Sequence, residues 1–483
     1  MSVIHETSIL EWQAAMTAGT TTSRELTLSF LQRIATYNKQ GIRINAICEL
    51  NPDALAIAES LDRERAVSGS RGPLHGIPVL IKDNIATSDK MHTTAGALAL
   101  ADSFASADAF VVTKLREAGA VILGKTNLTE WANFISNDMP DGYSSRGGQV
   151  LNPYGPGVLD VGGSSSGSAA GIAAGFAVVA VGTETSGSIL HPAEQNSLVG
   201  IKPTVGLISR SGIIPISHSQ DTAGPIARTV TDAAILLGAL TGIDEKDPVT
   251  GKSEGLAHTD YLPFLDADGL RGARIGVVRS RFLAECEAEE IALYEAAIEK
   301  LKETGATIID AVTIPTENAE WNIHVLVHEF KVGVNAYLKT LPASYPIRSL
   351  QDVISFNRAH EEQALLYGQE LLEESEQTSG TLTEPEYLAN RLFDLEMSQK
   401  QGLDAVMKEH ELDALLYPGS TGYAIPAKAG YPSITVPAGY TSAGKPFGIM
   451  LTGLAFQEPT LLRLAYAYEQ ATRLRVAPDM TKA

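Results

Sequence analysis

Two serine-rich clusters flank a segment of small and apolar residues in the centre of the chain. The first is Gly162-Gly163-Ser164-Ser165-Ser166-Gly167-Ser168, and the second is Gly182-Thr183-Glu184-Thr185-Ser186-Gly187-Ser188. The residues from Ile172 to Val181 between them are all small or apolar, which predicts a buried segment rather than a flexible linker. Small side chains let backbones approach closely, so we expect the two clusters to meet at one point.

A lysine at the end of a predicted buried strand is the candidate base for these serines. The apolar run from Gly76 to Ile81 leads directly into Lys82, a pattern that predicts a short buried strand. A serine hydroxyl is a weak nucleophile until a base accepts its proton. A lysine can act as that base only when its amine is neutral, which requires burial to lower its pKa from about 10.4 toward 7–8. From the spacing alone, Lys82 is either this base or an ordinary lysine that points into solvent.

Helices and buried strands alternate along most of the chain. A helix is expected over 108–118 and a strand over 120–123, while 274–316 is typical of a strand–helix–strand unit. Strands and turns return over 412–455. This order predicts an α/β fold with a mixed central β-sheet covered by helices on both faces.

The chain shows no internal repeat and no low-complexity linker. We therefore expect a single domain over 1–483, with a catalytic core over 65–235 and a helical surface layer over the charged segment 318–410. Apolar residues make up 44% of the 483 residues and charged residues 19%, which excludes disorder as the main state.

Charge and cysteine content exclude several classes of protein. The formal net charge of −20 argues against a nucleic-acid partner, because a negative surface repels phosphate. The two cysteines, Cys48 and Cys286, stand in no ligand spacing, so neither a disulfide framework nor a zinc site is expected. No apolar stretch is long enough to span a membrane. We expect a cytoplasmic protein, although removal of a signal peptide would leave the same start.

Three familiar motifs are present but lack the structural context that their chemistry needs. Gly119 to Thr126 matches the phosphate-loop pattern, yet its middle residues are typical of a strand. Gly163 to Gly167 matches the nucleophile elbow of α/β-hydrolases, but the residues before it form a poor strand. His324 and His328 are spaced as helical metal ligands, but no third ligand accompanies them.

The central clusters resemble the signature of the amidase signature family. Ser164 and Ser188 stand 24 positions apart, as in that family, and the segment before Lys82 resembles its lysine strand. Further matching segments are Leu123–Asn127, Gly200–Thr204, Asp221–Arg228 and Ala429–Ser433. The likeness covers nearly the whole chain in order.

The resemblance implies a serine hydrolase that needs no metal and no cofactor. It assigns Ser188 as the nucleophile, Ser164 as a bridging serine that follows a cis peptide bond, and Lys82 as the base. The oxyanion hole maps onto the backbone N–H groups of four consecutive residues, Thr185, Ser186, Gly187 and Ser188. The residues predicted to line the substrate pocket are Asn137, Asp138, Ser165 and His191.

Close to the predicted nucleophile, this chain departs from the sequence pattern that is commoner in the family. Glu184 stands where Asp is commoner and Leu190 where Arg is commoner, so a possible charge pair is changed at both positions. The sequence pattern with Glu184 resembles that of the peptide amidase branch, whose members remove the C-terminal carboxamide of peptides as ammonia. Ser186, His191 and Glu194 are further departures; Arg210 and Lys202 are candidate partners for Glu194.

These observations predict an enzyme that cleaves a C-terminal peptide amide or an amino-acid amide. An acylamidase, an esterase or a carbamate hydrolase would use the same triad with a different pocket. A glutamine-hydrolysing subunit of a tRNA amidotransferase would need a stable partner, whereas an autonomous enzyme is expected as a monomer or a homodimer. A catalytically inactive binding module is disfavoured, because all three triad residues are present.

Overall fold

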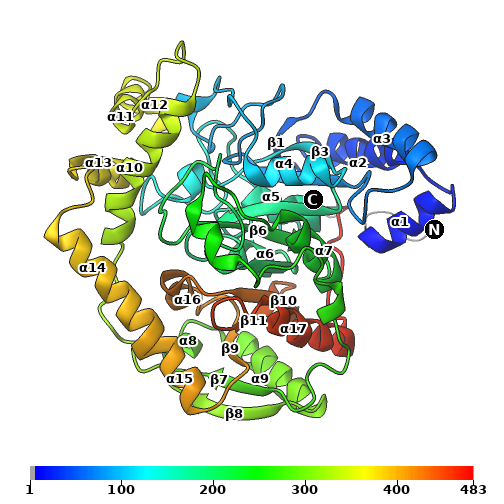
Figure 1. Cartoon of the computed structure of the whole chain (residues 1–483), viewed down its shortest axis with the longest axis vertical. Helices are drawn as coiled ribbons and strands as arrows, with labels where there is room; N and C mark the ends of the chain where they lie inside the picture. Colours follow the sequence, from blue (N-terminus) through cyan, green and yellow to red (C-terminus); the bar gives the residue numbers. More distant parts are fainter. Residues whose placement is uncertain (1–5, 482–483) are drawn as a thin grey trace.

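A single mixed sheet runs through the molecule in the computed structural model, which describes residues 6–481 (Figure 1). In sheet order, its eleven strands are β1 (Ile47–Leu50), β3 (Val121–Thr126), β2 (Pro78–Lys82), β4 (Val179–Glu184), β6 (Thr222–Ala227), β5 (Val199–Lys202), β10 (Ser433–Tyr440), β11 (Pro446–Thr452), β9 (Ala414–Pro418), β7 (Arg274–Val278) and β8 (Thr307–Val312). β2 is parallel to β3 and β4, β7 is parallel to β8 and β9, and the other neighbours are antiparallel. The predicted mixed α/β sheet is confirmed.

Helices cover the sheet so completely that every residue of β2, β4 and β6 is buried. The helices outside the segment 318–410 are α1 (Ile9–Thr17), α2 (Ser23–Tyr37), α3 (Ala54–Ser68), α4 (Phe110–Glu117), α5 (Ser166–Ala173), α6 (Leu190–Gln195), α7 (Val230–Leu240), α8 (Ser280–Leu283), α9 (Ala288–Glu303), α16 (Ala424–Ala429) and α17 (Glu458–Thr472). Short 3-10 turns are η2 (Leu98–Leu100), η3 (Glu130–Ala132), η4 (Pro248–Ser253) and η5 (Leu262–Phe264). α5 and α6 pack against each other on the central strands, and α17 packs on both α7 and α9.

The segment 318–410 is helical, as predicted, and lies along one side of the molecule (Figure 1). Its elements are α10 (His324–Thr340), α11 (Leu350–Ala359), α12 (Glu361–Ala364), α13 (Glu370–Gln377), α14 (Pro385–Leu395), the π-helical η6 (Glu396–Leu403) and α15 (Asp404–Glu409). The prediction of a surface layer is incomplete, because buried residues of this segment form one apolar cluster with residues of the segment 95–139. Phe330 of α10 is fully buried and its ring contacts those of Trp131 and Phe134.

The structure agrees with the prediction that the three familiar motifs lack the structural context that their chemistry needs. The phosphate-loop match ends in the buried strand β3, and Gly163–Gly167 leads into α5 without a preceding strand. His324 and His328 each face a glutamate of the segment 384–386, at 2.8 and 3.6 Å from Nδ1 to the carboxylate oxygen. Cys48 and Cys286 are free thiols.

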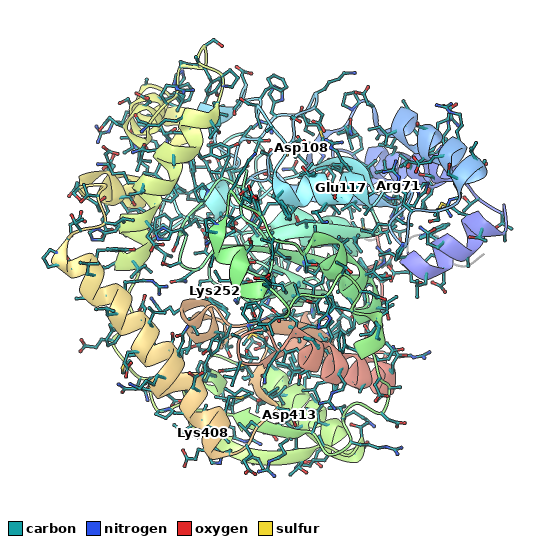
Figure 2. The ribbon with its side chains drawn as sticks, viewed as in Figure 1. Arg71, Asp108, Glu117, Lys252, Lys408 and Asp413 are labelled. Carbon is teal, nitrogen blue, oxygen red and sulfur yellow. The ribbon has the colours of Figure 1, made fainter. Side chains whose placement is uncertain are left out.

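Arg71 and Glu117, labelled in Figure 2, are charged residues exposed at the surface. Arg71 donates to the carbonyl oxygens of Arg116 and Glu117 at 3.0 and 3.3 Å. This places a cation at the carboxyl end of α4, where the helix dipole favours positive charge. None of the helices in residues 6–481 is long and apolar enough to cross a membrane. Of the N-terminal stretch Met1–Glu6, only Glu6 lies within the described residues.

Candidate active site

Lys82 is the last residue of the central strand β2, and its amine ends inside the protein rather than in solvent. Its side chain is fully buried, and Nζ lies 2.8 Å from Ser164 Oγ, 3.0 Å from Ser165 Oγ and 3.2 Å from the Thr183 carbonyl oxygen. β4 runs parallel to β2 and carries Thr183 alongside the lysine. The solvent-exposed alternative for Lys82 is therefore excluded by the fold.

The hydrogen-bond network around neutral Lys82 consists of two acceptors and one donor. The Thr183 carbonyl oxygen can only accept. Ser165 Oγ donates to that same carbonyl at 3.0 Å, so it accepts from the lysine. A neutral amine has two N–H bonds and one lone pair, and these two acceptors use both N–H bonds. The lone pair of neutral Lys82 is thus left for the hydroxyl hydrogen of Ser164.

Burial favours the neutral amine that this arrangement requires. It lowers the pKa of Lys82 from the ordinary lysine value to about 7, and the charges of Glu184 and Asp221 oppose that shift only in part. Asp221 accepts from the Thr185 hydroxyl and from two backbone N–H groups, and burial raises its pKa to about 6. Near neutral pH a substantial fraction of Lys82 can therefore accept a proton.

The two serine clusters meet, as predicted from the small residues between them. The Ser165 N–H donates to the Ser188 carbonyl oxygen at 3.1 Å, and the Gly163–Ser164 peptide bond is cis, as the resemblance implied. Ser188 lies on the turn between β4 and α6 and is 7% exposed. The buried pair Lys82 and Ser164 therefore lies next to a serine that still reaches a cavity.

Glu184 holds the turn that carries Ser188. Its carboxylate accepts from the N–H groups of Gly187, Ile189 and Leu190 at 2.8, 2.7 and 3.0 Å. Burial raises the pKa of Glu184, and the charge of Lys202 opposes this shift. The carboxylate thus needs no partner at position 190, which explains why a buried leucine is tolerated there.

The four-residue oxyanion hole predicted from the sequence needs a correction at Gly187. Its N–H already donates to Glu184 and is not free for a substrate oxygen. The N–H groups of Thr185, Ser186 and Ser188 have no acceptor within residues 6–481. Gly187 is required for another reason: its φ is +84°, and a Cβ atom there would lie 2.9 Å from the ring of Tyr423.

Ser188 lines a cavity of about 450 Å³ between the sheet and the segment 318–410. The predicted pocket residues Asn137 and His191 line this cavity, together with Ser186. Two predictions are wrong: Asp138 is exposed and outside the cavity, and Ser165 is fully buried beside Lys82. The apolar lining residues are Ala132, Phe134, Ile216, Ile323, Leu326 and Leu371.

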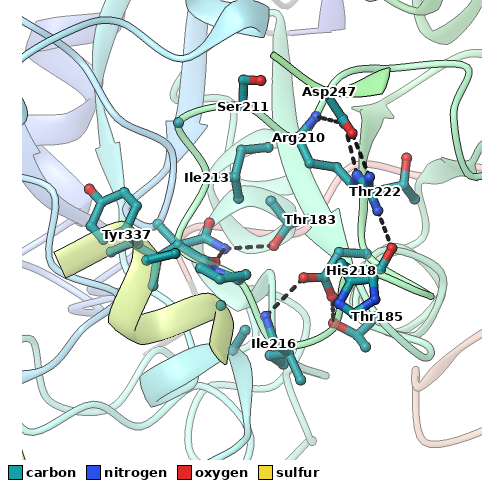
Figure 3. A pocket seen from close by; sticks show the side chains of 18 of the residues that line it. Thr183, Thr185, Arg210, Ser211, Ile213, Ile216, His218, Thr222, Asp247 and Tyr337 are labelled. Carbon is teal, nitrogen blue, oxygen red and sulfur yellow. Dashed lines mark hydrogen bonds and ion pairs between the residues drawn. The ribbon is translucent and has the colours of Figure 1, made fainter. Parts of the chain in front are cut away.

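A second cavity, of about 480 Å³, lies beside the turn of Ser188 and is shown in Figure 3. Thr183, Thr185, Ile216 and Tyr337 lie around it, and Arg210 is paired with Asp247 at its edge. It shares Ala132, Thr185 and Ile216 with the first cavity but includes neither Ser164 nor Ser188. The cavity that Ser188 lines is therefore the candidate substrate site.

His191 and Glu194, the unusual residues after Ser188, belong to one polar cluster. Glu194 accepts from the Ser420 hydroxyl at 2.6 Å, and that hydroxyl lies 3.3 Å from His191 Nδ1. The partners predicted from the sequence for Glu194 are wrong, because Arg210 binds Asp247 and Lys202 donates to the Pro203 carbonyl oxygen. Ser420 is more than two hundred residues away in the chain, so no local pattern could have indicated it.

His191 Nε2 lies 3.5 Å from a carboxylate oxygen of Asp141 and of Asp160. These three residues are the group in residues 6–481 whose ligand atoms are close enough together to hold a metal ion. The backbone N–H of His191 also donates to the Gly187 carbonyl oxygen, in the turn of Ser188, at 2.8 Å. The cluster forms the polar side of the cavity next to Ser188.

Comparison with known proteins finds amidases and related proteins that are similar to nearly the whole chain. The profile of the Amidase family matches residues 25–462. The structure of the native peptide amidase from Stenotrophomonas maltophilia superposes with a TM-score of 0.94 at 48% identity, over 98% of this chain and 99% of that one. A probable amidase of Arabidopsis thaliana is 44% identical over 98% of this chain and 92% of its own length. One subunit of the glutamyl-tRNA(Gln) amidotransferase of Chloroflexus aurantiacus is 33% identical over 98% of both chains.

The mixed sheet and the relatives that share it define a hydrolase that acts on amide bonds. The chain belongs to the Amidase family, also called the amidase signature family.

Two adjacent serines give a matched test of the network around Lys82. Ser165→Ala removes the hydroxyl that accepts from Lys82, so the lone pair is no longer directed at Ser164. We expect kcat for amide hydrolysis to fall by about tenfold or more, since a positioned base contributes at least that much. Ser166→Ala removes a buried hydroxyl that has no partner within residues 6–481, and kcat should change less than about threefold. Equal kcat values for the two variants would contradict the assigned direction of the lone pair.

Proposed function

We propose that this protein hydrolyses the carboxamide of a peptide C-terminus or of an amino acid, through an acyl-enzyme on Ser188, and releases ammonia. The observation that carries the proposal is the buried hydrogen bond between Lys82 Nζ and Ser164 Oγ, 2.8 Å long, beside the turn of Ser188. The likeness to a peptide amidase over nearly the whole chain supports the substrate class.

The reaction begins with two proton transfers in one direction. Neutral Lys82 accepts the hydroxyl proton of Ser164 while Ser164 accepts that of Ser188. The Ser188 oxygen then forms a bond to the amide carbonyl carbon, and the carbonyl oxygen becomes an oxyanion. The free N–H groups of Thr185, Ser186 and Ser188 are placed to stabilise this charge, and losing one such donor typically costs about 3–4 kcal/mol.

The second half returns the proton to the leaving group. The Lys82 ammonium donates through Ser164 to the amide nitrogen as the C–N bond breaks, and ammonia leaves. Water then attacks the ester on Ser188, and its proton passes back to Lys82 by the same relay. Lys82 returns that proton through Ser164 to the Ser188 oxygen as the ester bond breaks, and the carboxylic acid product ionises to a carboxylate.

Ammonia release from a short blocked peptide carboxamide tests the proposed reaction. We expect the wild-type protein to release ammonia and Ser188→Ala to lose nearly all of that turnover, because the residual rate without a nucleophile is several orders of magnitude lower. Thermal unfolding of both proteins provides the control for folding.

The outcomes separate the competing functions. Turnover of an aryl amide, an ester or a carbamate without ammonia release from the carboxamide would keep Ser188 as nucleophile and overturn the substrate class. Glutamine hydrolysis that requires a partner protein would favour the alternative function, a subunit of a tRNA amidotransferase. Undiminished ammonia release by Ser188→Ala would contradict the mechanism itself.

The pH dependence follows from the pKa of Lys82. The reactive form is the neutral amine, and burial lowers the pKa of Lys82 to about 7. Activity should therefore rise as the pH increases through about 7 and level off above it, measured as kcat/KM for the carboxamide between pH 6 and 9. A rate that falls steadily over this range, while the protein stays folded, would rule out Lys82 as the base.

A further inference from the structure

The catalytic cavity has one apolar side and one side with a net negative charge. Phe134, Ile216, Ile323, Leu326 and Leu371 supply the apolar side. Among the described residues that line this cavity, those with a charged form near neutral pH are Asp141 and His191. No lysine or arginine is among them, so any other charge must come from the residues just behind the wall.

Asp160 lies behind His191 and changes the balance of charge. His191 Nε2 is 3.5 Å from both carboxylates, so one imidazolium is shared between two acids. The neighbouring carboxylates raise the pKa of His191 although burial opposes them, which favours the charged ring. With His191 protonated and both acids ionised, the three residues carry a net charge of −1.

The Asp141 carboxylate lies close to the catalytic serines. A Cβ atom on Gly163 would be 2.2 Å from Asp141 Oδ1, so the carboxylate rests directly on the backbone that leads into Ser164. Its side chain is 21% exposed, which leaves it accessible from the cavity yet shielded from bulk water. An ion pair formed there is stronger than one on an open surface.

We propose that Asp141 binds the α-ammonium group of amino-acid amides that carry an apolar side chain, an inference that rests on the proposed function. Such a molecule has three substituents on one carbon: the carboxamide, the ammonium and the side chain. With the carboxamide at Ser188, the ammonium lies two bonds from the reacting carbon, on the side of the cavity that Asp141 occupies. The side chain then fits against the apolar wall of Ile216, Ile323 and Leu326. Burial raises the pKa of Asp141, and the charge of His191, 3.5 Å away, opposes that shift.

The test compares L-leucinamide with its hydroxy analogue, in which a hydroxyl replaces the ammonium and the rest of the molecule is unchanged. At pH 7 most of the α-amino group is protonated, because its pKa is about 7.7–8.0. We expect kcat/KM for ammonia release to be at least about tenfold higher with L-leucinamide. A ratio below about twofold in the wild-type protein would overturn the inference, and this comparison needs no variant.

Asp141→Asn keeps the size of the side chain and the acceptor oxygen but removes its charge. It should lower the ratio between the two substrates by about tenfold or more. Asp138→Asn makes the same change three residues away on an exposed side chain outside the cavity, and the ratio should stay at the wild-type value. An unchanged ratio in Asp141→Asn would overturn the assignment of Asp141.

The inference can fail without the proposed function. Ser188-dependent ammonia release from the blocked peptide carboxamide, with no preference for L-leucinamide over its analogue, would overturn only the role of Asp141. Absence of ammonia release from every carboxamide would overturn the proposed function and this inference together.

Discussion

The burial of the Lys82 amine is the constraint on which the account of this site depends. An exposed lysine keeps its proton at neutral pH and cannot accept another from a serine. The parallel strands β2 and β4 place the amine between the two serine clusters, where every contact is to a neutral oxygen. Because removing a charge from water is costly, burial lowers the pKa of Lys82 and favours its neutral amine. A neutral lysine can then serve as the base in place of a histidine.

A second buried ionisable group, the Glu184 carboxyl, stabilises the turn that carries Ser188. Glu184 gathers the N–H groups of Gly187, Ile189 and Leu190, so the chain between β4 and α6 closes around one carboxylate. The N–H of Ser188 has no acceptor within residues 6–481, so the donors that hold the turn differ from those that an oxyanion could use. Lys202 moderates the pKa of Glu184 from the nearby strand β5. The turn and the base therefore rest on strands of one sheet.

Much of this could be predicted from local sequence, and two of the failures, at Ser165 and Glu194, have a common physical cause. The buried strand before Lys82 and the convergence of the serine clusters follow from apolar patterning and small residues within short stretches. The pocket position predicted for Ser165 is wrong because Lys82 of β2 and Thr183 of β4 surround its hydroxyl inside the protein. The partner of Glu194 is beyond local prediction because Ser420 comes from a distant part of the chain. Contacts between side chains that are brought together only by tertiary packing produce no sequence spacing from which they could be predicted.

The protonation state of Lys82 is the central claim, and it can be measured directly. Heteronuclear NMR of the lysine ε-methylene groups, recorded against pH, reports the pKa of each amine, and comparison with Lys82→Met assigns the signal of Lys82. The account predicts that the signal absent from the variant titrates near pH 7. A signal that titrates near the ordinary lysine value of about 10.4 would show a charged amine at neutral pH and contradict the account.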